Sequence, residues 1–290
     1  VRDLLGFSVN LFGFSSINYW ARNADNLLIG RFLGASALGI YSKSYGIMLL
    51  PLRAISQTIG QVMFPAFSSI QDDKQRIAKV YLRIPFPGVV QNRHLTIGLW
   101  LVSDHFVLAV FGNHWAGMIP VLKVFCFVGM IQSIGTLNGN LYLSQGRSDL
   151  QFRVGLVING LAVGVIALGL RWELAGVAYA YGIFSILVAY PSIRIAVSLV
   201  ELTFSDLVRN LLWVSVCTAS MSIAVWALGL VLPSSWPHWA YLAAQVPAGV
   251  LAYVTLVHIF RLQAYQEIKE LICERFQLSR LPMVMTKFWS

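Results

Sequence analysis

The sequence predicts an all-α, polytopic membrane protein, and two observations predict it. Hydrophobic residues make up 57% of the 290-residue chain and charged residues 11%, whereas ordinary soluble domains carry roughly 25% charged residues. The apolar residues also gather in repeated runs of about 20 residues, which is the length that crosses a bilayer core of roughly 30 Å as a helix. Because backbone inside a bilayer must satisfy its own hydrogen bonds, these runs are expected to be helices.

We expect about eight membrane-spanning helices separated by short polar connections. Their ranges are 4–30, 38–68, 84–111, 118–143, 154–170, 174–197, 209–231 and 239–260. Residues 1–260 therefore form one helical bundle. Residues 261–290 form a polar tail with apolar residues at helical spacing, which predicts an amphipathic helix on the cytoplasmic membrane surface.

The second and third ranges are irregular. Pro51 in the second removes a helical hydrogen bond and should kink that helix. The third opens with prolines and then passes through the polar residues 91–94. It is either an interrupted span that lines a substrate path or a span that begins later, near Leu95, with 91–94 at the interface. The later start is the preferred interpretation, because it leaves Arg93 at the membrane interface, where its side chain can reach water.

The basic residues of the connections predict the orientation of the chain. They concentrate near 69–83, 144–153 and 198–208 and from residue 261 onward, whereas the opposite connections hold only Arg31 and Arg171. Cytoplasmic connections carry the excess of Lys and Arg, so both ends of the chain are predicted to be cytoplasmic. The net charge of +9 arises largely in these connections, and no basic stripe with interleaved aromatic residues indicates a nucleic-acid partner.

A polar stripe runs along the first predicted helix. Ser15, Asn18, Arg22 and Asp25 recur at helical spacing on one face, and Asn26 lies on the flank of that face. Ionisable residues at membrane depth usually face a polar cavity or pair with another charge, and a guanidinium suits phosphate. We predict that Asn18, Arg22, Asp25 and Asn26 line a substrate cavity. The alternative is a structural Arg22–Asp25 pair that holds two helices together.

Other charged residues lie within the predicted spans. Arg53, in the middle of the second span, is a further candidate for substrate contact. Asp25 and Asp104 are candidates for coupling transport to an ion or proton, although Asp104 and His105 could instead form a hydrogen-bonded pair near the outer surface. Lys123 is interpreted as reaching the outer interface rather than as contacting substrate.

No pattern in the sequence indicates catalysis, a metal or a cofactor. The GxSxG, HExxH and Walker motifs are absent, as is a GxGxxG in a βαβ context. The three cysteines form neither a disulfide framework nor a zinc pattern. The lack of a catalytic constellation favours a transporter over an enzyme.

Four stretches resemble a known family. They are NADNLLIGRFLGASALGIYSKSYGIMLLP at 23–51, VMFPAFSSIQDD at 62–73, FGNHWAGMIPVL at 111–122 and LNGNLYLSQGRSDL at 137–150. They resemble the bacterial polysaccharide flippases of the multidrug/oligosaccharidyl-lipid/polysaccharide exporter superfamily. The similarity is strong through residue 153 and continues as a hydropathy pattern. At 87–96 the chain is more polar than the family.

The resemblance implies two helical lobes with about fourteen spans, of which this chain would be a C-terminal fragment: the second lobe and two extra helices. The family moves isoprenoid-pyrophosphate-linked oligosaccharides across the bacterial cytoplasmic (inner) membrane for lipopolysaccharide and exopolysaccharide synthesis. The implied partners are this substrate, the bilayer and polysaccharide-assembly proteins. Members of the family use cationic residues in a central cavity. By position, the resemblance implies that Arg22, Asp25 and Arg53 are the cavity candidates in this chain.

Three alternatives remain open. A multidrug or cation exporter of the same superfamily should favour acidic cavity residues, whereas the deep charges here lean positive. A membrane polymerase or ligase acting on the same sugars would need a sizeable outer loop, and every predicted outer turn has about seven residues or fewer. The chain could also be an inactive truncated lobe, because a single lobe cannot enclose a cavity between two lobes.

Overall fold

The computed structural model describes residues 2–70, 73–83, 85–200, 204–233 and 235–259. The long helices of this part are α1 (Arg2–Phe32), α2 (Gly34–Ser69), α4 (Pro85–Val110), α5 (Met118–Ser144), α6 (Ser148–Gly169), α7 (Glu173–Val197), α8 (Phe204–Val231) and α9 (His238–Ile259). A short helix, α3 (Lys74–Arg83), follows α2. Three 3-10 turns complete the order: η1 (Asn113–Trp115), η2 (Leu170–Trp172) and η3 (Ser198–Val200).

The all-α prediction is confirmed, since the described residues contain helices and turns but no strand. Each predicted range corresponds to one long helix, although several helices begin earlier than hydropathy indicated. For example, α6 begins at Ser148 with Asp149 in its first turn. An acidic residue stabilises a helix N-terminus through the helix dipole, yet it lowers the local hydropathy. The predicted tail, 261–290, lies outside the described residues and stays a prediction.

The start of α4 concerns the irregular third range. The helix is continuous from Pro85 to Val110, so the polar residues 91–94 do not interrupt it, and a membrane span that begins near Leu95 stays a prediction. Proline is tolerated in the first turn of a helix, where its missing N–H would have no intrahelical acceptor. Arg93 and His94 further along also have partners in α8 and α9. The depth of these residues in a membrane stays a prediction.

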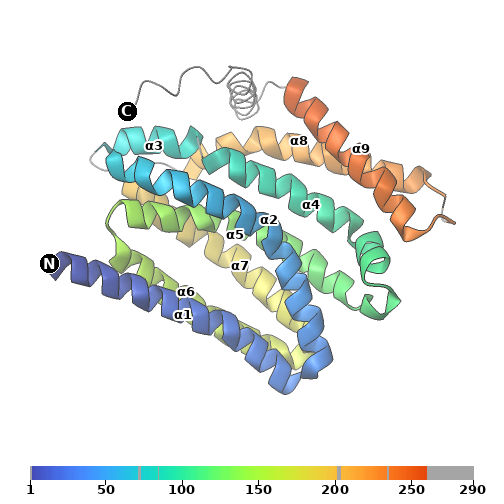
Figure 1. Ribbon diagram of the computed structural model, residues 1–290, viewed down its shortest axis with the longest axis horizontal. Coiled ribbons are helices and arrows are strands. Elements are labelled where there is room, and N and C mark those ends of the chain that lie inside the picture. Colours follow the sequence, from blue (N-terminus) through green and yellow to red (C-terminus); the bar gives the residue numbers. More distant parts are fainter. Residues whose placement is uncertain (1, 71–72, 84, 201–203, 234, 260–290) are drawn as a thin grey trace, which may run out of the picture.

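Helix α2 changes direction near its middle, as Figure 1 shows. Pro51 lies in the middle of this helix of 36 residues, which is where the sequence predicted a kink. Leu33 alone separates α2 from α1. Gly34 follows it with a φ of +86°, a left-handed conformation that glycine adopts without strain, so the chain reverses sharply between the two helices.

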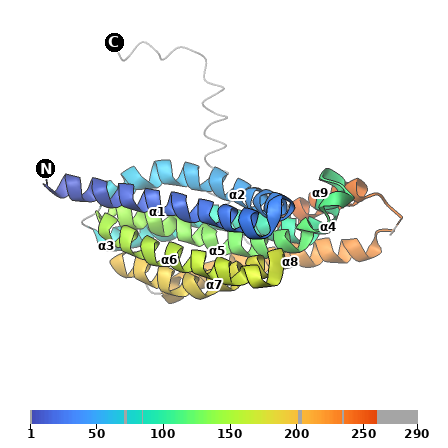
Figure 2. The ribbon, with the colours of Figure 1, turned by 90° about the horizontal axis from the view of Figure 1, so that it is seen from below.

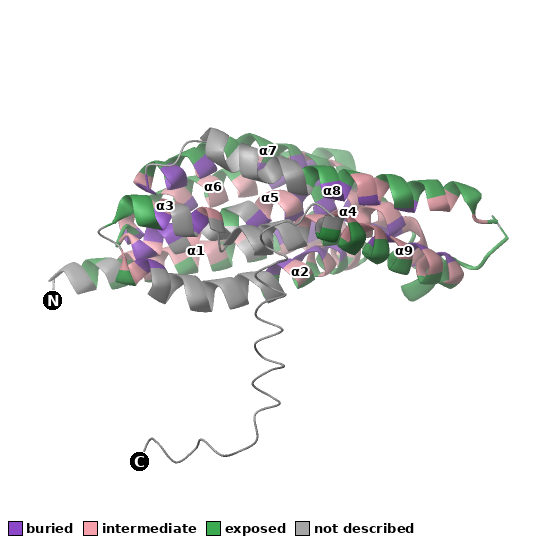
Figure 3. Ribbon diagram, turned by 90° about the horizontal axis from the view of Figure 1, so that it is seen from above, coloured by how far each residue is buried: buried purple, intermediate pink, exposed green. Residues whose placement is uncertain are grey.

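The helices pack in layers around α5. Helix α5 contacts α2, α4 and α7, while α1 pairs with α6. Figure 2 shows α1 and α2 on one side of the bundle, α6 and α7 on the other, and α5 between them. The α8–α9 hairpin meets the rest of the described chain mainly through α4. Buried residues lie between the helices and exposed ones along the outward sides (Figure 3).

The bundle has two distinct ends. One, called here the α3 end, carries the start of α1, α3 and the α5–α6 connection; the other, the η1 end, carries η1, η2 and the α8–α9 connection (Figure 1). At the α3 end, Ile77 and Tyr81 of α3 are buried against Phe67 of α2 and Tyr142 of α5. Burial raises the pKa of the Tyr81 hydroxyl above its ordinary value.

Many large apolar side chains point away from the bundle. Within the described residues, two stretches, 148–200 and 238–256, are long and apolar enough to cross a membrane. Their outward side chains include Leu187 of α7 and Leu251 of α9, which are 68% and 67% exposed. Such exposure is unfavourable in water and expected of a surface that faces lipid.

Candidate functional site

The predicted polar stripe of α1 contains one deeply buried carboxylate. Asp25 is only 6% exposed. The hydroxyl of Tyr41 in α2 donates a hydrogen bond to its Oδ2 at 3.0 Å, and the backbone N–H of Asn26 donates to its Oδ1 at 2.6 Å. A buried carboxylate requires such donors. Asp25 therefore joins α1 to α2 by a hydrogen bond between side chains.

Aromatic rings surround the inner side of this contact. Tyr41 stacks on Tyr45 with ring planes 3° apart, and both rings meet Phe125 of α5 edge-on. Phe125 in turn meets the ring of Tyr181 in α7 edge-on, and the amide of Gln132 donates to the Tyr181 hydroxyl at 2.9 Å. This aromatic layer packs α2, α5 and α7 together and includes Tyr41, the partner of Asp25.

The other predicted site residues are less enclosed. Asn18 and Asn26 are half-buried and Ser15 is exposed, so the expectation that the stripe faces the interior is met most fully at Asp25. The side chain of Arg22 lies outside the described part of the structure, so the Arg22–Asp25 pair stays a prediction. Arg53 is exposed. Among the described candidates, Asn18, Asn26 and Arg53 are therefore less enclosed than Asp25.

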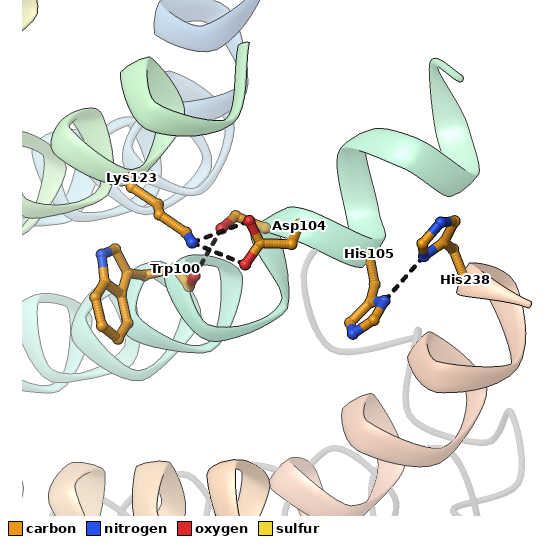
Figure 4. Close-up of polar contacts among 6 residues, drawn as sticks. Trp100, Asp104, His105, Lys123 and His238 are labelled. Carbon is orange, nitrogen blue, oxygen red and sulfur yellow. Dashed lines mark hydrogen bonds and ion pairs between the residues drawn. The ribbon is translucent and has the colours of Figure 1, made fainter. Parts of the chain in front are cut away.

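Asp104 has a different partner from the one expected. The ammonium of Lys123 in α5 lies 2.7 and 3.0 Å from its two carboxylate oxygens, and both side chains are partly exposed. Figure 4 shows Asp104 directed toward Lys123 and His105 directed elsewhere. The expected Asp104–His105 hydrogen bond is wrong, because consecutive helical residues do not face each other. Lys123 is likewise an ion-pair partner and not simply an interfacial side chain.

His105 contacts α9, which the sequence did not indicate. Its Nδ1 lies 3.1 Å from Nδ1 of His238, and its ring stacks on Tyr241 at 4.0 Å. The Tyr241 hydroxyl donates to the backbone carbonyl of Pro233 at 3.0 Å. These contacts fasten the start of α9 to α4 at the η1 end. No local pattern could pair histidines so far apart in the chain.

Arg93 and His94 form the second polar joint between α4 and the α8–α9 hairpin. Nη1 of Arg93 donates to the hydroxyl of Ser215 in α8 at 3.1 Å. The His94 ring stacks on Tyr253 of α9 with centroids 3.9 Å apart. The sequence marked these residues as polar but gave no signal for their partners. Among the described side chains, no three His, Cys, Asp or Glu residues lie close enough to hold a metal ion.

Several known proteins are similar to this chain in sequence. The sequence model of a family described as polysaccharide biosynthesis protein matches residues 1–120. The teichuronic acid biosynthesis protein TuaB of Bacillus subtilis is 31% identical over 96% of this chain, which covers 59% of TuaB. The lipopolysaccharide biosynthesis protein WzxC of Escherichia coli is 29% identical over 97% of the chain, which covers 58% of WzxC. The chain thus spans just under three-fifths of these relatives.

The fold is also similar to that of a solved transporter. A MOP superfamily transporter from Pyrococcus furiosus aligns with a TM-score of 0.54 over 88% of this chain and 63% of its own, at 14% sequence identity. At this identity the likeness concerns the fold alone. The chain is thus similar in sequence to polysaccharide biosynthesis proteins along most of its length, and its fold is similar to that of a MOP superfamily transporter.

Proposed function

We propose that this protein takes part in flipping an isoprenoid-pyrophosphate-linked oligosaccharide from the inner to the outer leaflet of the bacterial cytoplasmic membrane. The observation that carries the proposal is the similarity to TuaB along 96% of the chain, on a transporter fold. Because the chain spans 59% of TuaB, this activity is proposed for a protein with a second lobe, since such a cavity lies between two lobes.

We further propose that all eight long helices cross the membrane, with the α3 end in the cytoplasm. Exposed basic residues at that end support this orientation: Lys74, Arg76, Arg147 and Arg153. Lys and Arg accumulate in cytoplasmic connections. The η1 end instead presents exposed Trp172 and Trp239, and tryptophan is enriched at membrane interfaces.

The substrate path is proposed to run along α1 and α2. Asn18, Arg22, Asn26 and Arg53 would contact the sugar and pyrophosphate, and the guanidinium groups would supply forked donors for the phosphate oxygens. Asp25 is the candidate for ion coupling: its carboxylate accepts the Tyr41 hydrogen bond. Protonation would remove acceptor capacity and weaken the α1–α2 contact. A change at this joint would tilt α1, as alternating access requires.

Complementation tests the proposed function. The longest open reading frame that contains this chain is expressed in cells that make a lipid-linked repeat unit but lack a flippase, and polysaccharide at the cell surface is measured. We expect the surface polysaccharide to return and the accumulated lipid-linked precursor to fall. If the protein reaches the membrane at a normal level and neither quantity changes, the proposal is wrong. Expression of residues 1–290 alone tests the truncated-lobe alternative.

A further inference from the structure

The contact between His105 of α4 and His238 of α9 can form in only some protonation states of the two rings. Their Nδ1 atoms lie 3.1 Å apart, and Figure 4 shows this hydrogen bond between the two helices. One Nδ1 must therefore carry a proton and donate it to the other, which must be unprotonated. When both rings are protonated, both nitrogens are donors and both rings are positive. The hydrogen bond is then lost, and two like charges face each other at short range.

The charged groups beside this pair have partners of their own. Asp104 interacts electrostatically with His105, but both of its carboxylate oxygens accept from the ammonium of Lys123 in α5. Tyr241 of α9 stacks on the His105 ring and donates its hydroxyl proton to the carbonyl of Pro233. Neither group supplies an acceptor that replaces the second imidazole when both rings are protonated.

The other elements that pack against α4 near this end contribute few ionisable groups. In the described side chains of α8, residues 215–231, the one ionisable group is the buried thiol of Cys217. Helix α2 has Lys43 and η1 has His114, and both side chains are exposed. The paired histidines are therefore the groups expected to change charge at this contact between neutral and mildly acidic pH.

We propose that His105 and His238 form a pH-sensitive latch, which holds the start of α9 against α4 and opens in mildly acidic solution. Outside its own hairpin, α9 packs mainly against α4, so this contact lies in the interface that holds α9 in place. A protonated His238 also puts a positive charge in the first turn of α9, which has no acidic side chain and where the helix dipole disfavours a cation. The latch concerns contacts within this chain and does not rest on the proposed function.

Hydrogen–deuterium exchange of the purified 290-residue chain in lipid nanodiscs tests the latch. The measured quantity is the protection of the backbone amides of 242–246 in α9, corrected for the intrinsic exchange rate at each pH. A chelator is present throughout, so that no metal ion bridges the two rings. We expect protection to fall about fivefold from about pH 8 to about pH 5, as the loss of one neutral hydrogen bond would cause. Protection that does not change with pH overturns the proposal.

Replacement of one histidine by asparagine should keep the contact and remove its pH response. The asparagine amide can donate or accept near the position of Nδ1 and does not titrate, so we expect the protection of His238→Asn to stay within about twofold at both pH values. His114→Asn is the matched control, an exposed histidine at the same end, and should respond as wild type. His105→Asn should also lose the response and keeps the test decisive if His238→Asn does not fold. A response that persists in both variants assigns it to another group, such as His94, and overturns the proposal.

Discussion

Asp25 and Asp104 are two carboxylates in long helices of the same bundle, and their surroundings are opposite. Asp25 is 6% exposed and accepts hydrogen bonds from a phenol and a backbone amide. The side chain of Asp104 is 49% exposed and forms an ion pair with Lys123. Both residues were predicted candidates for ion coupling, but Asp104 already has the ammonium of Lys123 as its partner, whereas the donors to Asp25 are neutral. Asp25 is therefore the better candidate for ion coupling.

The two carboxylates also form different kinds of contact between helices, called joints here. Asp25 connects α1 to α2 through a buried contact backed by an aromatic layer, so its loss leaves a polar hydroxyl without a partner in the interior. The Asp104–Lys123 pair connects α4 to α5 where solvent or head groups can replace either partner. Buried polar contacts are expected to matter more for stability than partly exposed ion pairs.

Removal of the Asp25 carboxylate should have the largest effect. Asp25→Ala leaves the buried Tyr41 hydroxyl without this acceptor and opens a small void, so we expect the free energy of unfolding to fall by about 2–3 kcal/mol. The measurement is unfolding of the purified protein followed by circular dichroism. Asp104→Ala serves as the control, with an expected loss of about 1 kcal/mol or less. Equal losses would remove the distinction between the two joints.

Removal of the Tyr41 hydroxyl, the donor to Asp25, tests the stability of the same joint from its other side. Tyr41→Phe takes one hydrogen bond from Asp25, and we expect the free energy of unfolding to fall by about 1–3 kcal/mol. Tyr81→Phe is the matched control, since the Tyr81 hydroxyl is buried without a hydrogen-bond partner in the described structure. That change should be neutral or stabilising. A larger loss from Tyr81→Phe than from Tyr41→Phe contradicts the assigned contacts.

The histidine contact at the η1 end should have an intermediate effect. A double-mutant cycle with His105→Ala and His238→Ala is expected to give a coupling free energy of about 0.5–1.5 kcal/mol, typical of a neutral hydrogen bond. Unfolding in denaturant measures each variant. Tyr241, which also stacks on His105, is left unchanged so that the cycle reports the pair alone. Additive losses would show that the two rings do not interact.

The Asp104–Lys123 pair should have the smallest effect. A cycle with Asp104→Asn and Lys123→Gln is expected to give a coupling of about 0.2–1 kcal/mol, because both side chains are partly exposed. The coupling should decrease as salt is added. A coupling above about 1 kcal/mol, or one that salt leaves unchanged, would mean that this pair is more shielded than its exposure indicates.

Hydropathy predicted the long helices well and the polar contacts poorly. Apolar runs determine where helices lie, because each buried or lipid-facing residue adds to the same signal. Hydropathy gave no partner for Arg93 or His94, whose contacts lie on α8 and α9. The polar run at 91–94 does not interrupt α4, and two of its residues, Arg93 and His94, have partners elsewhere in the bundle.

At the candidate site, the sequence indicated the polar face that contains Asp25 but not the hydrogen-bond partner of that residue. Helical spacing placed Asp25 on the polar face of α1, and its burial agrees with that interpretation. Spacing could not indicate that Tyr41 would be the donor, because the contact depends on how tightly the chain reverses at Gly34. The Asp104–Lys123 pair was also missed, since it requires the packing of α4 against α5.

Substrate flipping by variants of the two aspartates tests the central claim most directly, namely that the polar residues of α1 and α2 serve transport. The longest open reading frame containing the chain is reconstituted in liposomes with a lipid-linked oligosaccharide, and the rate of translocation is measured for Asp25→Asn and Asp104→Asn. We predict that Asp25→Asn slows translocation at least about tenfold, or about 1.4 kcal/mol, with the protein still folded, while Asp104→Asn remains within about twofold of wild type. Normal translocation by folded Asp25→Asn protein, or a larger loss from Asp104→Asn, would contradict the claim.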